Sequence, residues 1–332
     1  MASYSGRRKF LATLGGAAAA WPLAARAQQP AMPVIGLLDN RAAETTADRL
    51  RGFHRGLRES GYVEGESVSI VYRWADGDNR RLPELAADLI RRQVAVIAAT
   101  GGTPTALAAK AATATIPIVF AVPEDPVGLG LVASLPRPGG NLTGVNFFNA
   151  EVAAKRLELM RELVPSAKRV AVLVNPTNAA NMEANLRQLQ PAAETLGAEI
   201  EVVRAASSRE IDAAFAAMAR ERPDMLFVMG DALFNSRRLQ LAMLAARHML
   251  PASYAQRDYP VSGGLMSYGT DVTDAFRQVG FYVGRILKGA RPADLPAVQA
   301  AKFQLVINAQ TARLLDLTVP PTLLARADEV IE

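Results

Sequence analysis

Short apolar runs that alternate with helical segments constrain the fold more than any other feature of this sequence. The run at residues 116–122 is continuous and apolar, as is typical of a strand that is buried on both faces of a sheet. The pattern begins again with a helix at 152–163 and a strand at 170–174. Two such arrays predict parallel sheets with helices on both faces. A chain of 332 residues also exceeds a single comfortable core, so we expect two domains of the α/β class.

The units that follow Gly263-Gly264 are too few to form a third domain. They comprise a strand at 265–268, a helix at about 271–288, a strand at 303–307 and a helix at 309–317. We expect these units to be added to the two existing arrays. The chain must then cross between the two domains more than once.

The N-terminus has the three parts of an export signal. Arg7-Arg8-Lys9 is followed by an apolar, small-residue stretch at 10–20 and by Ala25-Arg26-Ala27, which has the form of a signal-peptidase site. The alternative is an ordinary N-terminal helix. The basic cluster also resembles a twin-arginine signal. We expect residues 1–27 to be removed and the mature protein, which begins near Gln28, to be soluble in the periplasm.

The charge and the cysteine content exclude several classes of protein. The whole chain has a formal net charge of +5, but residues 1–27 hold four of the basic residues and no acid, so the mature chain is at +1. No basic run with interleaved aromatic residues remains, and nucleic acid is therefore not expected as a partner. The chain has no cysteine, which excludes disulfides, thiol catalysis, cysteine-ligated metals and a lipid-anchored cysteine.

The sequence offers no assembled catalytic group. Its two histidines, His54 and His248, lie in helical segments without a metal-binding or nucleophile motif. Carboxylates cluster only as solvated helix faces, such as Glu158 and Glu162. We therefore expect neither an enzyme nor a cofactor or metal.

Candidate ligand-binding residues follow the ends of predicted strands, where open α/β sheets bind their ligands. The turn Gly101-Gly102-Thr103-Pro104 would offer backbone N–H groups and a hydroxyl to a carboxylate or phosphate, although a plain capped helix start fits equally well. Short polar residues at the other strand ends either bind a ligand or form turns. The candidates of this kind are Asn40, Thr103, Asp125, Asn178 and Asp231.

Three further candidates lie near the presumed crossing between the arrays: Tyr254, Arg257 and Tyr268. There an aromatic wall and a charge would meet a small ligand. For the tyrosines, packing in the core or at the hinge is the alternative.

Several motifs, taken in order, resemble those of a known family. They are Thr103-Pro104, the run Ile-Pro-Ile-Val-Phe at 116–120, Asp125-Pro126-Val127, Gly130-Leu131-Val132, Pro138-Gly139-Gly140-Asn141-Leu142-Thr143-Gly144, Asn175-Pro176, Leu287-Lys288-Gly289 and Val306-Ile307-Asn308. In these motifs the chain resembles the ABC-transporter substrate-binding proteins that include tryptophan- and tyrosine-type binders. The resemblance covers essentially the whole mature chain, and its most specific part runs from Asp125 to Gly144.

The resemblance implies a type I periplasmic-binding fold. This fold has two Rossmann-like lobes with parallel sheets flanked by helices, three hinge crossings and a ligand in the cleft between the lobes. On this basis we expect a first lobe of residues 32–147 plus 265–297, and a second lobe of residues 148–264 plus 298–332.

The resemblance also implies a function and places Thr103 and Asp231 near the ligand. Where the aromatic-amino-acid members have Gln after Thr-Pro and Glu in the second-lobe loop, this chain has Leu107 and Asn178. We expect an exported receptor that captures a small ligand, such as an amino acid or another carboxylate, and delivers it to an inner-membrane ABC permease. The alternatives are an exported enzyme of unknown reaction and a ligand-sensing protein for another membrane partner.

Overall fold

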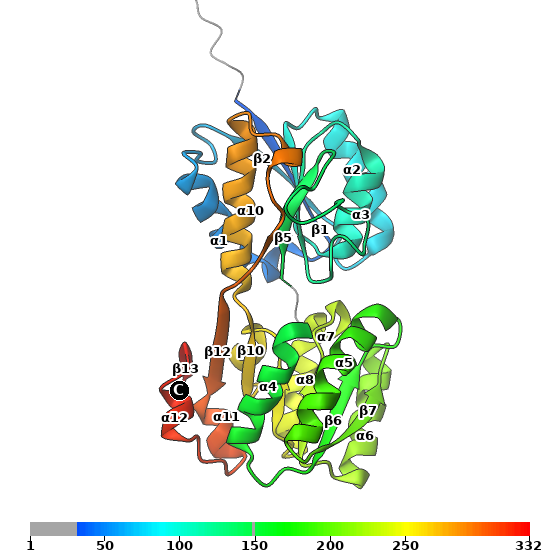
Figure 1. Cartoon of the computed structure of the whole chain (residues 1–332), viewed down its shortest axis with the longest axis vertical. Helices are drawn as coiled ribbons and strands as arrows, with labels where there is room; N and C mark the ends of the chain where they lie inside the picture. The colour runs from blue at the N-terminus through cyan, green and yellow to red at the C-terminus, as the bar shows by residue number, and fades with distance from the viewer. Residues whose placement is uncertain (1–31, 148–149) are drawn as a thin grey trace, which may run out of the picture.

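The computed structural model describes residues 32–147 and 150–332, which form two α/β lobes stacked along the long axis of the molecule (Figure 1). Each lobe contains one sheet with helices on both of its faces. The predicted α/β class with two lobes is confirmed.

The first sheet has six parallel strands in the order β11-β5-β4-β3-β1-β2. Its strands are β1 (Val34–Asp39), β2 (Ser69–Trp74), β3 (Val96–Ala99), β4 (Ile118–Val122), β5 (Leu142–Asn146) and β11 (Val298–Gln299). The helices of this lobe are α1 (Ala47–Glu59), α2 (Leu82–Arg91), α3 (Thr103–Ala112) and α10 (Val272–Leu287).

The second sheet has seven strands in the order β13-β12-β10-β9-β8-β6-β7, and only the β10–β12 pair is antiparallel. Its strands are β6 (Arg169–Val174), β7 (Glu199–Arg204), β8 (Met225–Val228), β9 (Ala252–Tyr254), β10 (Met266–Thr270), β12 (Phe303–Asn308) and β13 (Glu329–Ile331). The helices of this lobe are α4 (Ala150–Leu163), α5 (Ala179–Thr195), α6 (Ser208–Glu221), α7 (Ala232–Ser236), α8 (Arg238–Arg247), α9 (Asp258–Val261), α11 (Ala309–Leu314) and α12 (Pro321–Leu324).

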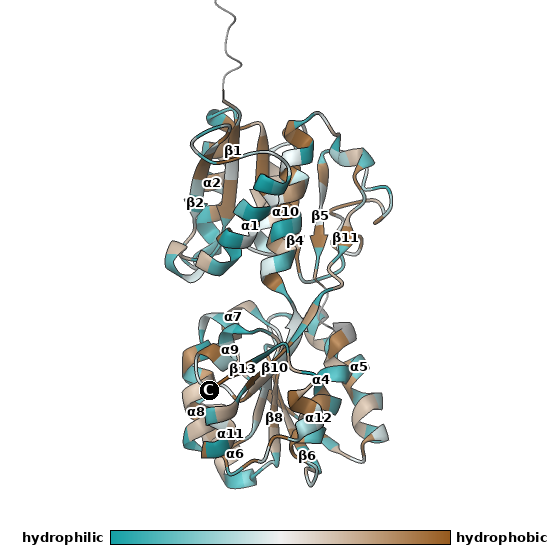
Figure 2. Cartoon of the chain, turned by 90° about the vertical axis from the view of Figure 1, so that its left-hand side faces the viewer, coloured by the Kyte–Doolittle hydropathy of each residue, from teal (hydrophilic) through white to brown (hydrophobic). Residues whose placement is uncertain are grey.

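Apolar side chains fill both faces of both sheets. Figure 2 shows the strands mostly in brown inside each lobe and many hydrophilic residues on the surrounding helices. Every residue of β4 is buried, which fits its continuous apolar sequence. Helices α1 and α2 instead place apolar residues on one face, as amphipathic helices on a sheet do.

The chain passes between the two sheets three times, as expected: after β5, between β10 and α10, and between β11 and β12. Two expected lobe boundaries are wrong. β10 pairs with β9 and β12, so the second crossing follows Thr270 and does not precede Leu265. Gly264 belongs to a turn within the second lobe, where a Cβ would lie 2.7 Å from the Tyr254 ring. β11 pairs with β5, so the third crossing follows Ala300 rather than residue 297.

Helices α1 and α10 pack at very short range because glycines face each other between them. A Cβ at Gly56 would lie 1.8 Å from the carbonyl oxygen of Arg277, and one at Gly280 would lie 2.1 Å from that of Phe53. The Ser60 hydroxyl donates across the same contact to the carbonyl oxygen of Phe281, at 3.1 Å. This contact joins a late segment of the chain to the first lobe (Figure 1).

We predict that Gly56→Ala lowers the free energy of unfolding by about 1–3 kcal/mol or more, because the added methyl group must push two helices apart. Urea denaturation followed by circular dichroism measures this loss. Arg55→Ala is the matched control, since the Arg55 side chain is 70% exposed on the same helix. An unchanged unfolding midpoint in Gly56→Ala would show that the helices separate at no cost.

Candidate functional site

The loops at the carboxyl ends of the parallel strands meet between the lobes. In the first lobe they follow β1, β3 and β4, and in the second they follow β6, β8 and β9. The two lobes contact each other in two places near these loops. Parallel strands collect their carboxyl ends at one edge of a sheet, which is where ligands bind in α/β proteins.

In the first lobe, the side chains of Thr103 and Glu124 lie against each other. Thr103 is the first residue of α3, and its hydroxyl donates a hydrogen bond to Glu124 Oε2 instead of capping its own helix. Glu124 follows the end of β4, and Asn146 Nδ2 donates to its carbonyl oxygen. Strand ends β4 and β5 thus hold the loop that presents the Glu124 carboxylate.

In the second lobe, Asp231 is held by two asparagines. It is 8% exposed and follows the end of β8. Asn175 Nδ2 donates to its Oδ1 at 3.0 Å, and Asn178 Nδ2 donates to its Oδ2 at 3.2 Å. Its Oδ1 also accepts the backbone N–H of Leu233 at 2.8 Å, which caps α7.

These two groups meet across the lobes. The Glu124 carboxylate of the first lobe lies within electrostatic range of Asn178 and Asp231 of the second lobe. We call the set Thr103, Glu124, Asn175, Asn178 and Asp231 the interlobe site.

The interlobe site is acidic. Among the residues that the structure describes, neither Glu124 nor Asp231 forms a salt bridge with a basic side chain. Burial raises the pKa of Glu124, and the nearby charge of Asp231 raises it further, while the hydrogen bond from Thr103 and the nearby Asn178 amide lower it. Two carboxylates with no counter-charge favour the binding of a cationic group.

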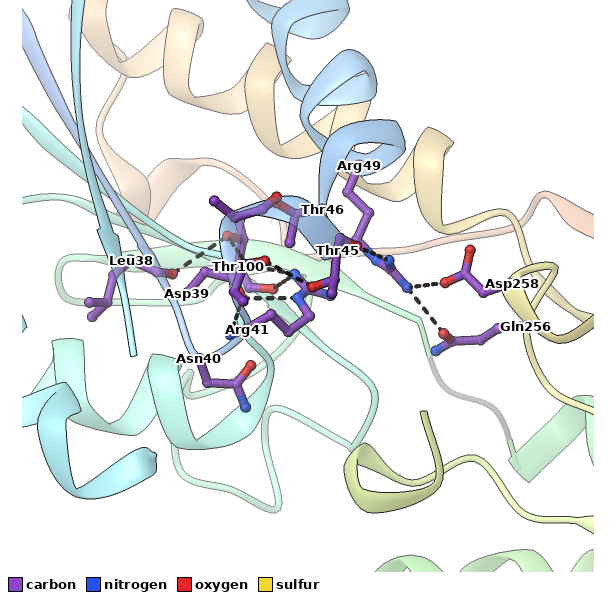
Figure 3. Close-up of polar contacts among 12 residues, drawn as sticks. Leu38, Asp39, Asn40, Arg41, Thr45, Thr46, Arg49, Thr100, Gln256 and Asp258 are labelled. Carbon is purple, nitrogen blue, oxygen red and sulfur yellow. Dashed lines mark hydrogen bonds and ion pairs between the residues drawn. The ribbon is translucent and has the colours of Figure 1, made fainter. Parts of the chain in front are cut away.

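A second contact between the lobes is made by Arg49, near the start of α1 (Figure 3). Its Nη2 lies 2.9 Å from Asp258 Oδ2 and 3.1 Å from Gln256 Oε1, both in the segment that follows β9. The Arg49 side chain is only 10% exposed, and burial lowers its pKa. Opening the lobes would separate this buried cation from its acidic partner, so the Arg49 bridge favours the form in which the lobes touch.

The structure brings together three of the candidates predicted from the sequence: Thr103, Asn178 and Asp231. Asn40 follows β1, and its side-chain amide donates to Asn79 Oδ1 of the same lobe, at 3.5 Å. The exposed Asp125 accepts the backbone N–H groups of Val127 and Gly128, so it caps its own turn.

Three other candidates have partners within the protein. Tyr254 is fully buried in the second-lobe core and stacks on Tyr259 at 4.3 Å, so it does not form the expected aromatic wall. Arg257 forms a two-bond ion pair with Glu329. The half-buried Tyr268 packs near Phe303, with ring centroids 6.1 Å apart.

Glu124 and Arg49 are not among the site residues expected from the sequence. An Asp before a Pro typically caps its own turn, so the Asp125 carboxylate is occupied by the turn that it begins. The adjacent Glu124 is therefore the better ligand candidate of the two. No sequence pattern marks Arg49 as a contact between the lobes, because a polar residue in the first turn of a helix is normally exposed to solvent.

Residues 32–147 and 150–332 contain no group of three or more His, Cys, Asp or Glu side chains placed to hold a metal ion. Within the same residues, no helix has both the length and the apolar character needed to cross a bilayer.

Two α/β lobes joined by three crossings, with polar strand-end loops that meet between them, define a two-lobed ligand-binding protein. The model of the ABC transporter substrate binding protein family matches residues 34–331, and the chain belongs to that family. The family is one of solute-binding receptors rather than of enzymes.

The relatives support this assignment. A tyrosine-binding protein of Clostridioides difficile is 28% identical over 267 residues, which are 80% of this chain and 76% of that protein. A Streptococcus pneumoniae structure in complex with L-Trp is 27% identical and has a TM-score of 0.81, covering 90% of this chain and 99% of the other. A conserved domain protein of Vibrio cholerae is 30% identical, with a TM-score of 0.80 and the same coverage.

We predict that Arg49→Met shifts the ligand-free protein toward separated lobes by about 1–2 kcal/mol, because Asp258 loses a charged hydrogen-bond donor. Since the chain has no cysteine, one cysteine introduced in α2 and one in α6 can carry a fluorescent pair that reports the distance between the lobes. Arg51→Met is the control, as its side chain is 72% exposed and pairs only within α1. The same distance in both variants would show that the Arg49 bridge does not hold the lobes.

Proposed function

We propose that this chain is an exported solute receptor whose ligand carries a protonated amine. The amine binds between Glu124 and Asp231, and the ligand passes to an inner-membrane permease without chemical change. The observation that carries the proposal is that Glu124 of one lobe lies within electrostatic range of Asp231 and its hydrogen-bond partner Asn178 of the other lobe. An ammonium group offers several donors and a positive charge to such a pair.

Known ligands of two relatives support an amine. One relative is named for binding tyrosine, and the other was solved with L-Trp. Both ligands carry an α-ammonium group. The aromatic side chain is not part of our proposal, because this chain has Leu107, 41% exposed, and Asn178 where the resemblance places Gln and Glu.

Closure of the lobes would couple binding to delivery. The amine would replace the missing counter-charge on both lobes at once, so it would stabilise the form in which the lobes touch more than the separated form. The Arg49 bridge would act in the same direction on the other contact. A permease could then distinguish the loaded receptor from the empty one by its shape.

Export rests on the N-terminal sequence, whose expected signal at residues 1–27 lies outside the described residues. Its basic cluster, apolar stretch and small-residue cleavage site support removal of this segment and a periplasmic location. The twin-arginine-like motif supports a folded route of export.

We predict that amines with a small organic body raise the melting temperature of the mature protein, and that Glu124→Gln and Asp231→Asn each weaken the best of them at least about 10-fold. A thermal-shift screen followed by calorimetry measures both effects. Asp125→Asn is the matched control, since that carboxylate caps its own turn. Mass spectrometry of the recovered ligand tests whether it leaves the receptor chemically unchanged. A best ligand without an amine, or a ligand recovered in altered form, would refute the proposal.

We predict that affinity for an amine falls as the pH is lowered from about 8 to about 5, because the cation needs ionised Glu124. Burial raises the pKa of Glu124, so its proton remains bound to a higher pH than in an ordinary glutamate, and amine binding must release it. Calorimetry in two buffers of different ionisation enthalpy reports the proton release. Glu124→Gln should flatten the pH dependence and Asp125→Asn should leave it unchanged, whereas an equal dependence in all three proteins would contradict the assignment to Glu124.

A further inference from the structure

Arg156, on α4, is a buried cation without an acidic partner. It is 3% exposed, and its one hydrogen bond within the described residues runs from Nη2 to the carbonyl oxygen of Val228, at 2.9 Å. The guanidinium carbon lies 3.7 Å from the centre of the Phe227 ring, while the buried Nε has no hydrogen-bond acceptor. No salt bridge joins Arg156 to any described acid. Burial lowers its pKa to about 9.

Arg156 lies at the edge of the second sheet that carries the interlobe site. Val228 is the last residue of β8, and the loop after it holds Asp231. Tyr259 lies within electrostatic range of both Arg156 and Asp231. Helix α4 itself begins directly after the first crossing between the lobes (Figure 1). The guanidinium is therefore placed beneath the strand-end loops and not at the outer end of the lobe.

A carbonyl oxygen and an aromatic face do not neutralise a buried guanidinium. A charge removed from water is costly unless an opposite charge and further hydrogen bonds compensate for it. The other buried arginine of this region, Arg49, has such compensation from Asp258. Arg156 retains a free donor and an unmatched charge at the edge where ligands bind. This combination suits an anionic group that arrives with the ligand.

We propose that Arg156 is the counter-charge for a carboxylate of the ligand. This inference deepens the proposed function and rests on it. The site would then recognise a zwitterion: its ammonium group between Glu124 and Asp231, and its carboxylate on Arg156. The planar, two-donor geometry of a guanidinium matches a carboxylate and gives the ligand a fixed orientation.

The test compares L-tryptophan with tryptamine, which keeps the amine and lacks the carboxylate. Calorimetry of the mature wild-type protein should show L-tryptophan binding roughly 30-fold or more tightly than tryptamine. Arg156→Gln should remove this difference by weakening L-tryptophan alone. Arg161→Gln is the matched control on the same helix, because Arg161 acts on Asp224, which precedes β8 at the opposite end of the strand from Asp231.

Equal affinity of the wild-type protein for the two probes would overturn the role of Arg156 and leave the amine proposal intact. A difference that survives in Arg156→Gln would overturn it as well.

The melting temperature of the ligand-free protein gives a readout that does not depend on the probes. Arg156→Met removes an unmatched charge and keeps an apolar contact with Phe227, so the melting temperature should stay the same or rise. A fall of more than about 4 °C, or failure of Arg156→Met and Arg156→Gln to fold, would show that Arg156 serves the fold and would overturn the proposal.

Discussion

The parallel direction of the strands is the constraint on which the rest of the structure depends. Every strand of the first sheet and most of the second run parallel, so the loops after β1, β3, β4, β6, β8 and β9 lie at the facing edges of the two sheets. The strands are mostly filled by apolar side chains. The polar groups of the interlobe site therefore come from the segments that follow the strands, and the three crossings bring these segments of both lobes together.

The charges at these loops are unbalanced in a specific way. Within residues 32–147 and 150–332, Glu124 and Asp231 have no cationic partner and Arg156 has no anionic one, while other pairs, such as Arg257 with Glu329 and Arg73 with Asp88, are complete. Unmatched buried charge lowers the stability of the ligand-free protein. A ligand that carries both charges would pair with these groups and remove this destabilisation. Part of its affinity would therefore come from the unpaired charges of the ligand-free receptor.

Much of the fold is predictable from the sequence because buried parallel strands give long apolar runs. The lobe boundaries near Gly263 and residue 297 are not predictable in this way. The glycine pair at 263–264 is compatible with a hinge between lobes as well as with the turn that it forms against Tyr254. The short strand β13 at Glu329–Ile331 is also invisible, because three residues are too few for a period.

The candidate site is predictable in part for the same physical reason. Thr103, Asn178 and Asp231 follow strand ends, and strand ends converge whatever the detailed packing. Tyr254 is misassigned because β9 has only three residues, so its sequence does not show which face of the strand is buried. Arg49 and Arg156 lie on helices, where the pattern of apolar residues alone does not distinguish a solvated arginine from one that points inward.

The close contact between α1 and α10 has a consequence for how the chain acquires its structure. The first lobe lacks α10 and β11 until residues 272–299 have been made, and the second lobe lacks β12 and β13 until almost the last residue. During synthesis the glycine face of α1 and the edge of β5 remain uncovered. The first lobe can be completed only after most of the second lobe has been made, so this receptor becomes compact late, unlike a protein of two consecutive domains.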